Sequence, residues 1–140
     1  MRVDTFTPRD AMRPIGPYSH IAKAGPFISI SATAGVDPAT GELAGPDAYS
    51  QARQILASFR GLLESVGSGI DRVLHVHVFL MDMGDFDEMN RAYRECFVSH
   101  QPARTVIGVS ALPKPGALLT MNLTAITDGD AGQVPARSGG

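Results

Sequence analysis

The chain has 140 residues, of which 44% are hydrophobic and 19% are charged, and its formal net charge is -2. This length and composition predict one globular domain with a buried core, and they exclude a disordered chain. The slight acidic excess, without any basic block, disfavours nucleic acid as a partner, because neutralising phosphates needs clustered cations.

Cys96 is the single cysteine, so no internal disulfide is possible, which is typical of a protein from a reducing compartment. The N-terminal residues lack the apolar core of a signal peptide, and no apolar run approaches the roughly 20 residues that cross a bilayer. We therefore expect a soluble, cytoplasmic protein with no membrane partner.

Two short apolar runs, at 18–24 and 27–33, are separated by Gly25-Pro26 and predict a hairpin or a pair of neighbouring strands. Residues 35–46 are rich in Gly, Pro, Asp and Thr, and this composition predicts a loop.

A long helix is predicted next. Asp47 is a candidate N-cap, apolar residues recur at helical spacing from 48 to 66, and Gly67 stands where a C-terminal glycine stop belongs.

Residues 73–80 form a nearly continuous β-prone run, which predicts a central strand. A second helix is predicted over 85–98, where Asp85 and Glu88 have the spacing of a capping box.

Two further strands are predicted at 103–109 and 117–127, and residues 128–140 are interpreted as a flexible C-terminal tail outside a single domain of residues 1–127. The order of elements predicts an α+β fold in which two helices pack on one face of a mixed β-sheet.

Such a layer leaves the other sheet face uncovered. Val73, His75, His77 and Phe79 are alternate residues of one predicted strand and would make that face partly apolar. Oligomerisation through the sheet is therefore expected.

His75 and His77 form a His-x-His pair that could bind zinc, but a site needs a third ligand that the sequence does not place nearby. The simpler interpretation, two polar residues on a subunit-facing surface, is preferred, so no metal is expected. Cys96 falls in an apolar helical stripe, which indicates packing rather than catalysis. Motifs of serine hydrolases and nucleotide-binding loops are absent from the sequence.

Arg104 follows Pro102 at the head of a predicted strand. A guanidinium presents a planar fork that matches a carboxylate, so Arg104 could bind a carboxylate ligand; an ordinary exposed strand end is the alternative. Tyr18 follows the predicted Gly16-Pro17 turn and could likewise be a ligand-binding residue or an ordinary half-buried tyrosine of the sheet.

Several segments together resemble the RidA/YjgF family, the reactive enamine/imine deaminases. They occur in the family's order and cover about residues 14–127: Gly16-Pro17-Tyr18, Ile30-Ser31, Asp37-Pro38-Ala39-Thr40-Gly41-Glu42, Gln51-Ala52-Arg53-Gln54, Val78-Phe79-Leu80-Met81-Asp82-Met83, Asp85-Phe86, Met89-Asn90-Arg91-Ala92-Tyr93, Pro102-Ala103-Arg104-Thr105, Leu112-Pro113 and Gly116-Ala117-Leu118.

The resemblance implies a chorismate-mutase-like fold and a homotrimer whose sheets surround a central barrel, with small-molecule clefts between subunits. It also implies hydrolysis of 2-imino acids and their enamine tautomers to 2-keto acids and ammonia, without a metal or an organic cofactor. The expected partner is a small substrate that carries a carboxylate.

By the same resemblance, Arg104 matches the arginine that binds the substrate carboxylate. Tyr18 matches a tyrosine of the cleft, Ser31 a serine of its wall, and Asn90 a helix asparagine near the site. A bidentate Arg104 contact would leave the C=N carbon of the substrate open to a positioned water.

Thr120 departs from the family pattern, because it stands where active members carry a glutamate. A threonine can bind a water but cannot take its proton near neutral pH, and general acid–base assistance contributes about 10²–10⁴-fold. Thr120 is therefore kept as a catalytic-site residue of altered function. Val106 stands where the family frequently has a cysteine, and Ala32-Thr33 stands where a Gly-Gln pair is common in the family.

Three functions follow. The leading one is a deaminase for 2-imino acids that is weakened or altered in specificity. The second is a non-catalytic trimer that binds small carboxylates. The third, a ribonuclease or translation inhibitor, is disfavoured by the acidic balance of the chain.

Overall fold

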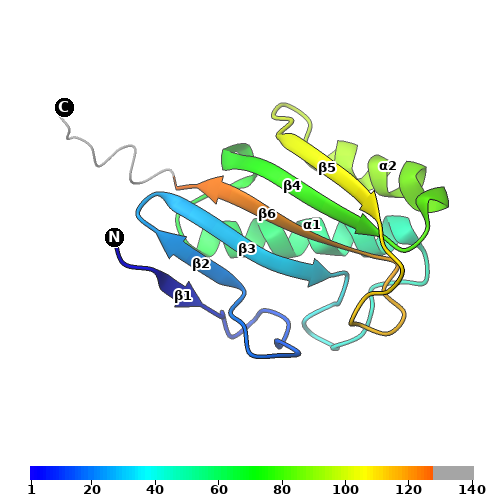
Figure 1. Ribbon diagram of the computed structural model, residues 1–140, viewed down its shortest axis with the longest axis horizontal. Helices are drawn as coiled ribbons and strands as arrows, with labels where there is room; N and C mark the ends of the chain where they lie inside the picture. The colour runs from blue at the N-terminus through cyan, green and yellow to red at the C-terminus, as the bar shows by residue number, and fades with distance from the viewer. Residues whose placement is uncertain (128–140) are drawn as a thin grey trace.

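The computed structural model describes residues 1–127. Six strands form one sheet in the order β1-β2-β3-β6-β4-β5, and two helices accompany it (Figure 1). The elements in chain order are β1 (Asp4–Phe6), β2 (Ile21–Ala24), β3 (Phe27–Ala34), α1 (Ala48–Ser65), η1 (Ile70–Arg72), β4 (Val73–Leu80), η2 (Met83–Asp85), α2 (Phe86–Cys96), β5 (Ala103–Gly108) and β6 (Leu119–Ile126).

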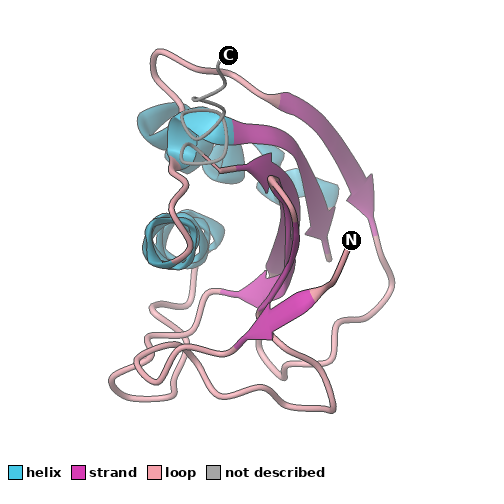
Figure 2. Cartoon of the chain, turned by 90° about the vertical axis from the view of Figure 1, so that its left-hand side faces the viewer, coloured by secondary structure: helices cyan, strands magenta, loops and turns pink. Residues whose placement is uncertain are grey.

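The sheet is mixed, because β4 and β5 pair in parallel and all other neighbours pair antiparallel. The parallel pair requires a crossover, which α2 provides, and α1 provides the longer crossover from β3 to β4. When two crossovers have the same handedness and move along the sheet in the same direction, their helices lie on the same face of the sheet. Figure 2 shows both helices on the same side of the curved sheet, which confirms the predicted α+β architecture.

The core lies between the helices and this face of the sheet. On β6, for example, Leu119, Met121, Leu123 and Ala125 are at most 1% exposed and alternate with residues of the opposite face. Burying one large aliphatic side chain contributes about 1.5–3 kcal/mol, so this layer supplies most of the stability.

The first predicted helix is confirmed together with its caps. The Asp47 side chain accepts hydrogen bonds from the Ser50 amide at 3.0 Å and from the Ser50 hydroxyl at 2.8 Å. These bonds hold the pKa of Asp47 below its usual value. Gly67 follows the helix with a φ of 78°, in the left-handed region that favours glycine.

The capping box predicted for α2 is wrong. The Asp85 side chain makes no capping bond, because the preceding turn η2 gives it φ and ψ angles of -88° and 5° instead of an extended backbone. Glu88 instead accepts a hydrogen bond from the Tyr49 amide at 3.2 Å, at the start of the other helix. The helix also ends at Cys96, two residues earlier than predicted.

The prediction that Val73 lies on the uncovered face of the sheet is also wrong. The pairing of β4 with β6 shifts between Val73 and His75, and this irregularity turns Val73 into the core, where it is 2% exposed. His75, His77 and Phe79 do share the face away from the helices, where they are only partly buried.

Strand β1 was not predicted; it consists of three residues that pair with β2 at the edge of the sheet. The other strands and the loop over 35–46 match their predictions within three residues at each end. Within residues 1–127, no helix is both long and apolar enough to cross a membrane. The predicted tail, 128–140, lies outside the described residues.

Candidate functional site

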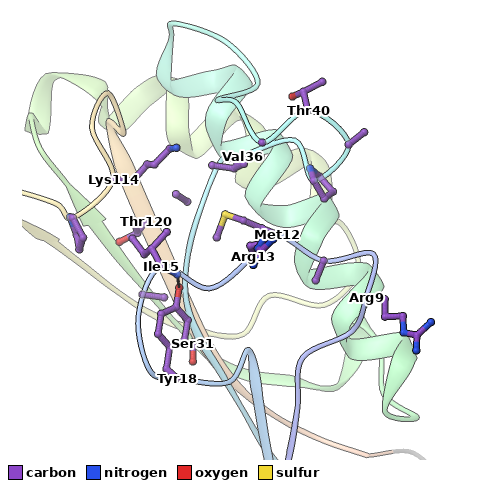
Figure 3. Close-up of a pocket in the computed structure, with 17 residues that line it drawn as sticks. Arg9, Met12, Arg13, Ile15, Tyr18, Ser31, Val36, Thr40, Lys114 and Thr120 are labelled. Carbon is purple, nitrogen blue, oxygen red and sulfur yellow. Dashed lines mark hydrogen bonds between the residues drawn. The ribbon is translucent and has the colours of Figure 1, made fainter.

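A cavity of about 880 Å³ opens beside the end of β3 (Figure 3). Its walls come from the N-terminal segment 9–18, the end of β3, the loop 38–41, the loop before β6 and β6 itself. Three of the sequence-predicted site residues line it: Tyr18, Ser31 and Thr120. This cavity is called the cleft below.

Hydrogen bonds tie the N-terminal wall of the cleft to β3. The Ser31 hydroxyl donates to the Ser19 carbonyl at 2.7 Å. The Tyr18 hydroxyl accepts from the Ile15 amide at 3.4 Å, and the Tyr18 ring meets the buried His20 ring edge-on. His20 in turn bonds to the Met12 carbonyl, so the whole segment is held against the sheet.

Thr120 reaches the cleft from the opposite wall. It lies on the face of β6 away from the helices, beside Phe79 of β4 and Ala34 of β3, and is 7% exposed. Its chain neighbours Leu119 and Met121 point into the core. The alternation of β6 therefore presents the side chain of residue 120, rather than its neighbours, to the cleft.

The wall formed by the end of β3 rests directly on α1. A Cβ added to Gly35 would lie 2.4 Å from the Gln51 carbonyl oxygen and 2.7 Å from its Cα, so only glycine permits this approach. The buried Gln51 side chain donates to the carbonyls of Gly45 and Gly116 at 3.0 and 3.3 Å, and accepts from the Leu118 amide at 2.9 Å. Gln51 thus joins the loops on both sides of the cleft.

Arg104 and Asn90 form a second group. The Arg104 Nη1 donates to the Asn90 Oδ1 at 2.6 Å, and the Arg104 guanidinium lies 4.7 Å from the centre of the Tyr93 ring and 5.7 Å from that of Phe86. Arg104 is the register partner of Val76, so its side chain leaves the edge strand β5 toward α2. Three contacts with one helix therefore orient the guanidinium.

Tyr93 was not among the predicted site residues, yet it supports Arg104. Its side chain is 7% exposed, and its hydroxyl has no hydrogen-bond partner within residues 1–127. Burial raises the pKa of Tyr93 to about 12, against the opposing effect of the Arg104 charge. The hydroxyl therefore stays neutral at physiological pH, and the ring serves as a platform for the cation.

The two groups are not brought together within one chain. Neither Arg104 nor Asn90 lines the cleft, and two strands, β6 and β4, separate β3 from the edge strand β5. The cleft does contain three cations that sequence analysis did not select, Arg9, Arg13 and Lys114. No sequence motif signals them, because they come from loops about 100 residues apart.

The histidine pair lies outside both groups. The rings of His75 and His77 stack with centres 4.4 Å apart, and His75 bonds to the Thr105 hydroxyl at 2.9 Å. Among the described residues, no group of three or more His, Cys, Asp or Glu side chains could hold a metal ion. Cys96 is half-buried beside Arg60, and burial raises the pKa of its thiol, which disfavours the reactive thiolate.

Residues 8–127 match the family model described as Endoribonuclease L-PSP. This chain belongs to the RidA/YjgF family. A RutC family protein of Pyrococcus horikoshii is 44% identical over 114 residues, which cover 81% of this chain and 90% of the relative. The human protein named 2-iminobutanoate/2-iminopropanoate deaminase is 35% identical over 112 residues, which cover 80% of this chain and 81% of the human protein.

Solved structures of RidA/YjgF proteins share the fold. The YjgF gene product of E. coli aligns with a TM-score of 0.82 and 31% identity, over 88% of this chain and 98% of its own. The resemblance inferred from scattered sequence segments is thereby confirmed over nearly all the described residues.

Proposed function

We propose that this protein hydrolyses small 2-imino acids to 2-keto acids and ammonia in clefts shared between the subunits of a homotrimer. The observation that carries the proposal is the arrangement of Arg104. Its guanidinium is held by Asn90 and Tyr93, is partly exposed at the edge strand, and forms no salt bridge within residues 1–127. A preorganised cation without an acidic partner is suited to bind a substrate carboxylate.

The separation of the two groups supports a shared site. In the proposed trimer, Arg104 and Asn90 of one subunit face Tyr18, Ser31 and Thr120 of its neighbour. The uncovered face of the sheet, with the partly buried Phe79, would line the central barrel. This arrangement would also bury apolar surface that a monomer leaves in water.

In the proposed reaction, Arg104 holds the substrate carboxylate in a bidentate contact. A water adds to the C=N carbon, and its proton passes to the nitrogen, which gives a tetrahedral amino alcohol. The hydroxyl proton of that intermediate then passes to the nitrogen while the C–N bond breaks, so ammonia leaves and the carbon becomes the carbonyl of the keto acid. The Thr120 hydroxyl binds the attacking water but cannot deprotonate it near neutral pH, so a slow reaction is expected.

The human and goat relatives named 2-iminobutanoate/2-iminopropanoate deaminase support this reaction class, at 35% and 37% identity to this chain. One observation favours a second function. None of the residues that line the cleft is an aspartate or a glutamate, so the cleft of one chain supplies no carboxylate base. A non-catalytic trimer that binds small carboxylates would need no such base.

A coupled assay that generates imines from several amino acids and measures their loss tests the proposal. The wild type should accelerate hydrolysis of 2-iminopropanoate or 2-iminobutanoate, and Arg104→Ala should abolish the effect. Arg53→Ala removes an exposed arginine of α1 and serves as the matched control. Equal rates for the wild type and Arg104→Ala would contradict the role of Arg104, and carboxylate binding without hydrolysis would select the second function.

Mixing two inactive variants tests the shared site. If each cleft takes Arg104 from one subunit and Tyr18 and Thr120 from the next, every trimer that contains both Arg104→Ala and Tyr18→Ala subunits has one intact cleft. Activity should therefore reappear after the two proteins are unfolded and refolded together. Light scattering should find a trimer at micromolar concentration; a monomer would contradict the assembly.

A further inference from the structure

The cleft is positively charged. Three of its lining residues are cations, Arg9, Arg13 and Lys114, and none is an acid. Asp37 lies next to the cleft in sequence, but its carboxylate accepts a hydrogen bond from the Ala39 amide at 2.9 Å and is not part of the lining. The cations thus have no carboxylate partner inside the cleft.

Two of the cations are placed to meet a ligand. Figure 3 shows Lys114 extending over the cleft from the loop before β6, and Arg13 beside Met12 near its centre. Arg9 lies at the far end, and its guanidinium points away. Lys114 is partly buried and Arg13 is exposed, so water screens the attraction of Lys114 for an anion less than that of Arg13.

Thr120 contributes to this charge. A glutamate at this position would place one negative charge in the cleft and offset one of the cations, whereas threonine leaves both Lys114 and Arg13 uncompensated. The same residue that removes the proton acceptor therefore makes the cleft more attractive to anions.

The size of the cleft also exceeds what the smallest imino acids need. A 2-imino acid with six non-hydrogen atoms would fill roughly 180 Å³ if each atom took the share of one liquid water, about 30 Å³. The cleft of one chain, about 880 Å³, exceeds this volume several-fold before a neighbouring subunit covers part of it, which leaves room for a longer side chain with a polar end.

From the charge and the size of the cleft we infer that its ligands are 2-imino acids with a second carboxylate on the side chain, and that Lys114 and Arg13 bind this second carboxylate. The inference rests on the proposed function for the first carboxylate, which Arg104 of a neighbouring subunit holds. The dicarboxylate is then bound at both ends, with the C=N carbon between them near Thr120.

Binding of stable keto acids tests the inference without any turnover. Calorimetry would compare 2-oxoglutarate with 2-oxopentanoate, which has the same chain length but lacks the second carboxylate. The dicarboxylate should bind at least about ten-fold more tightly, the ratio expected from a charge-assisted hydrogen bond. Lys114→Met should lower this ratio, since only Arg13 then remains to bind the second carboxylate, and Lys114→Arg should retain it.

Lys23→Met is the matched control, because Lys23 is the only other lysine of the chain and does not line the cleft. It should leave the ratio of the two affinities as in the wild type. Equal binding of the two keto acids by the wild type, no detectable binding of either, or an equal effect of Lys23→Met and Lys114→Met would overturn the inference.

The imine assay separates this result from the proposed function. A dicarboxylate preference that depends on Lys114, in a protein that hydrolyses no imine, would support the ligand class and contradict the deaminase. Imine hydrolysis without that preference would leave the deaminase in place and overturn the inference.

Discussion

The Arg104 guanidinium donates a hydrogen bond to the Asn90 carboxamide oxygen over 2.6 Å, which ties the edge strand of the sheet to α2. Asn90 therefore acts as a positioning residue, since it orients a cation that the substrate itself would contact. Its neutral amide leaves the positive charge of Arg104 intact for the substrate carboxylate.

Variants of Asn90 should separate orientation from charge. Asn90→Ala should raise KM for a 2-imino acid about ten-fold, as expected for loss of a bond to a charged group, with a smaller change in kcat. Asn90→Asp retains the shape but pairs Arg104 with a carboxylate, so KM should rise further. Steady-state kinetics on the three proteins checks this order; an Asn90→Asp protein with the KM of the wild type would contradict it.

Thr120→Glu should raise kcat for imine hydrolysis, because it restores a group able to take a proton from the attacking water. General-base assistance is worth about 10²–10⁴-fold, so an increase of ten-fold or more is expected even with imperfect geometry. Thr5→Glu places the same charge at an exposed position of β1 outside the cleft, and should bring no gain. Equal rates for all three proteins would mean that another group transfers the proton.

Tyr93→Phe should stabilise the protein by about 1 kcal/mol, since it removes a buried hydroxyl without a hydrogen-bond partner in residues 1–127 and keeps the ring beside Arg104. Denaturant unfolding at pH 8 measures the gain. A loss of stability would indicate that the hydroxyl is bound in solution.

The same variant should change the response to high pH. The pKa of Tyr93 is raised from 10.0 to about 12, so the folded state holds this proton more tightly than the unfolded state. The contribution to the free energy of unfolding is constant below pH 10 and is lost as the pH rises toward 12. At pH 11 the wild type should lose about 1 kcal/mol more than Tyr93→Phe; parallel pH curves would contradict the shift.

Gln51→Ala should destabilise the protein by about 2–4 kcal/mol, because it leaves a cavity and deprives three backbone groups of their partner. Gln54→Ala, three residues further along α1, is the control. Gln54 is partly buried, and within residues 1–127 its side chain bonds only to the Ser58 hydroxyl, at 3.2 Å. Its cost should stay below about 1 kcal/mol. Urea unfolding measures both variants, and similar midpoints for the two would contradict this role of Gln51.

Local sequence patterns predicted those helices and strands whose periodicity and end signals lie within the element itself or directly beside it. Helix α1 combines helical spacing, an Asp47 cap and a Gly67 stop, and β4 is a continuous β-prone run. The orientation of Val73 and the cap of α2 could not be predicted in this way. Each depends on a partner distant in sequence: β6 sets the shift beside Val73, and Glu88 bonds to Tyr49 of the other helix.

The family resemblance selected the five candidate site residues, of which the chemistry of Arg104 had separately indicated a carboxylate ligand, and their grouping came only from the structure. Tyr18, Ser31 and Thr120 meet because β6 inserts beside β3, a long-range pairing that no local pattern contains. The contact of Arg104 with Tyr93 likewise depends on how α2 packs on the sheet. The roles assigned to these residues stay predictions for the experiments above.

The approach of Gly35 to the backbone of Gln51 has a consequence for how this protein could adapt to new substrates. Because the end of β3 touches the α1 backbone with no side chain between them, that wall cannot retreat to admit a bulkier ligand without displacing a helix of the core. Change in ligand size must instead come from the walls made of loops, the N-terminal segment and the turn that carries Lys114. Insertions or substitutions there can reshape the cleft while the rigid wall keeps its place.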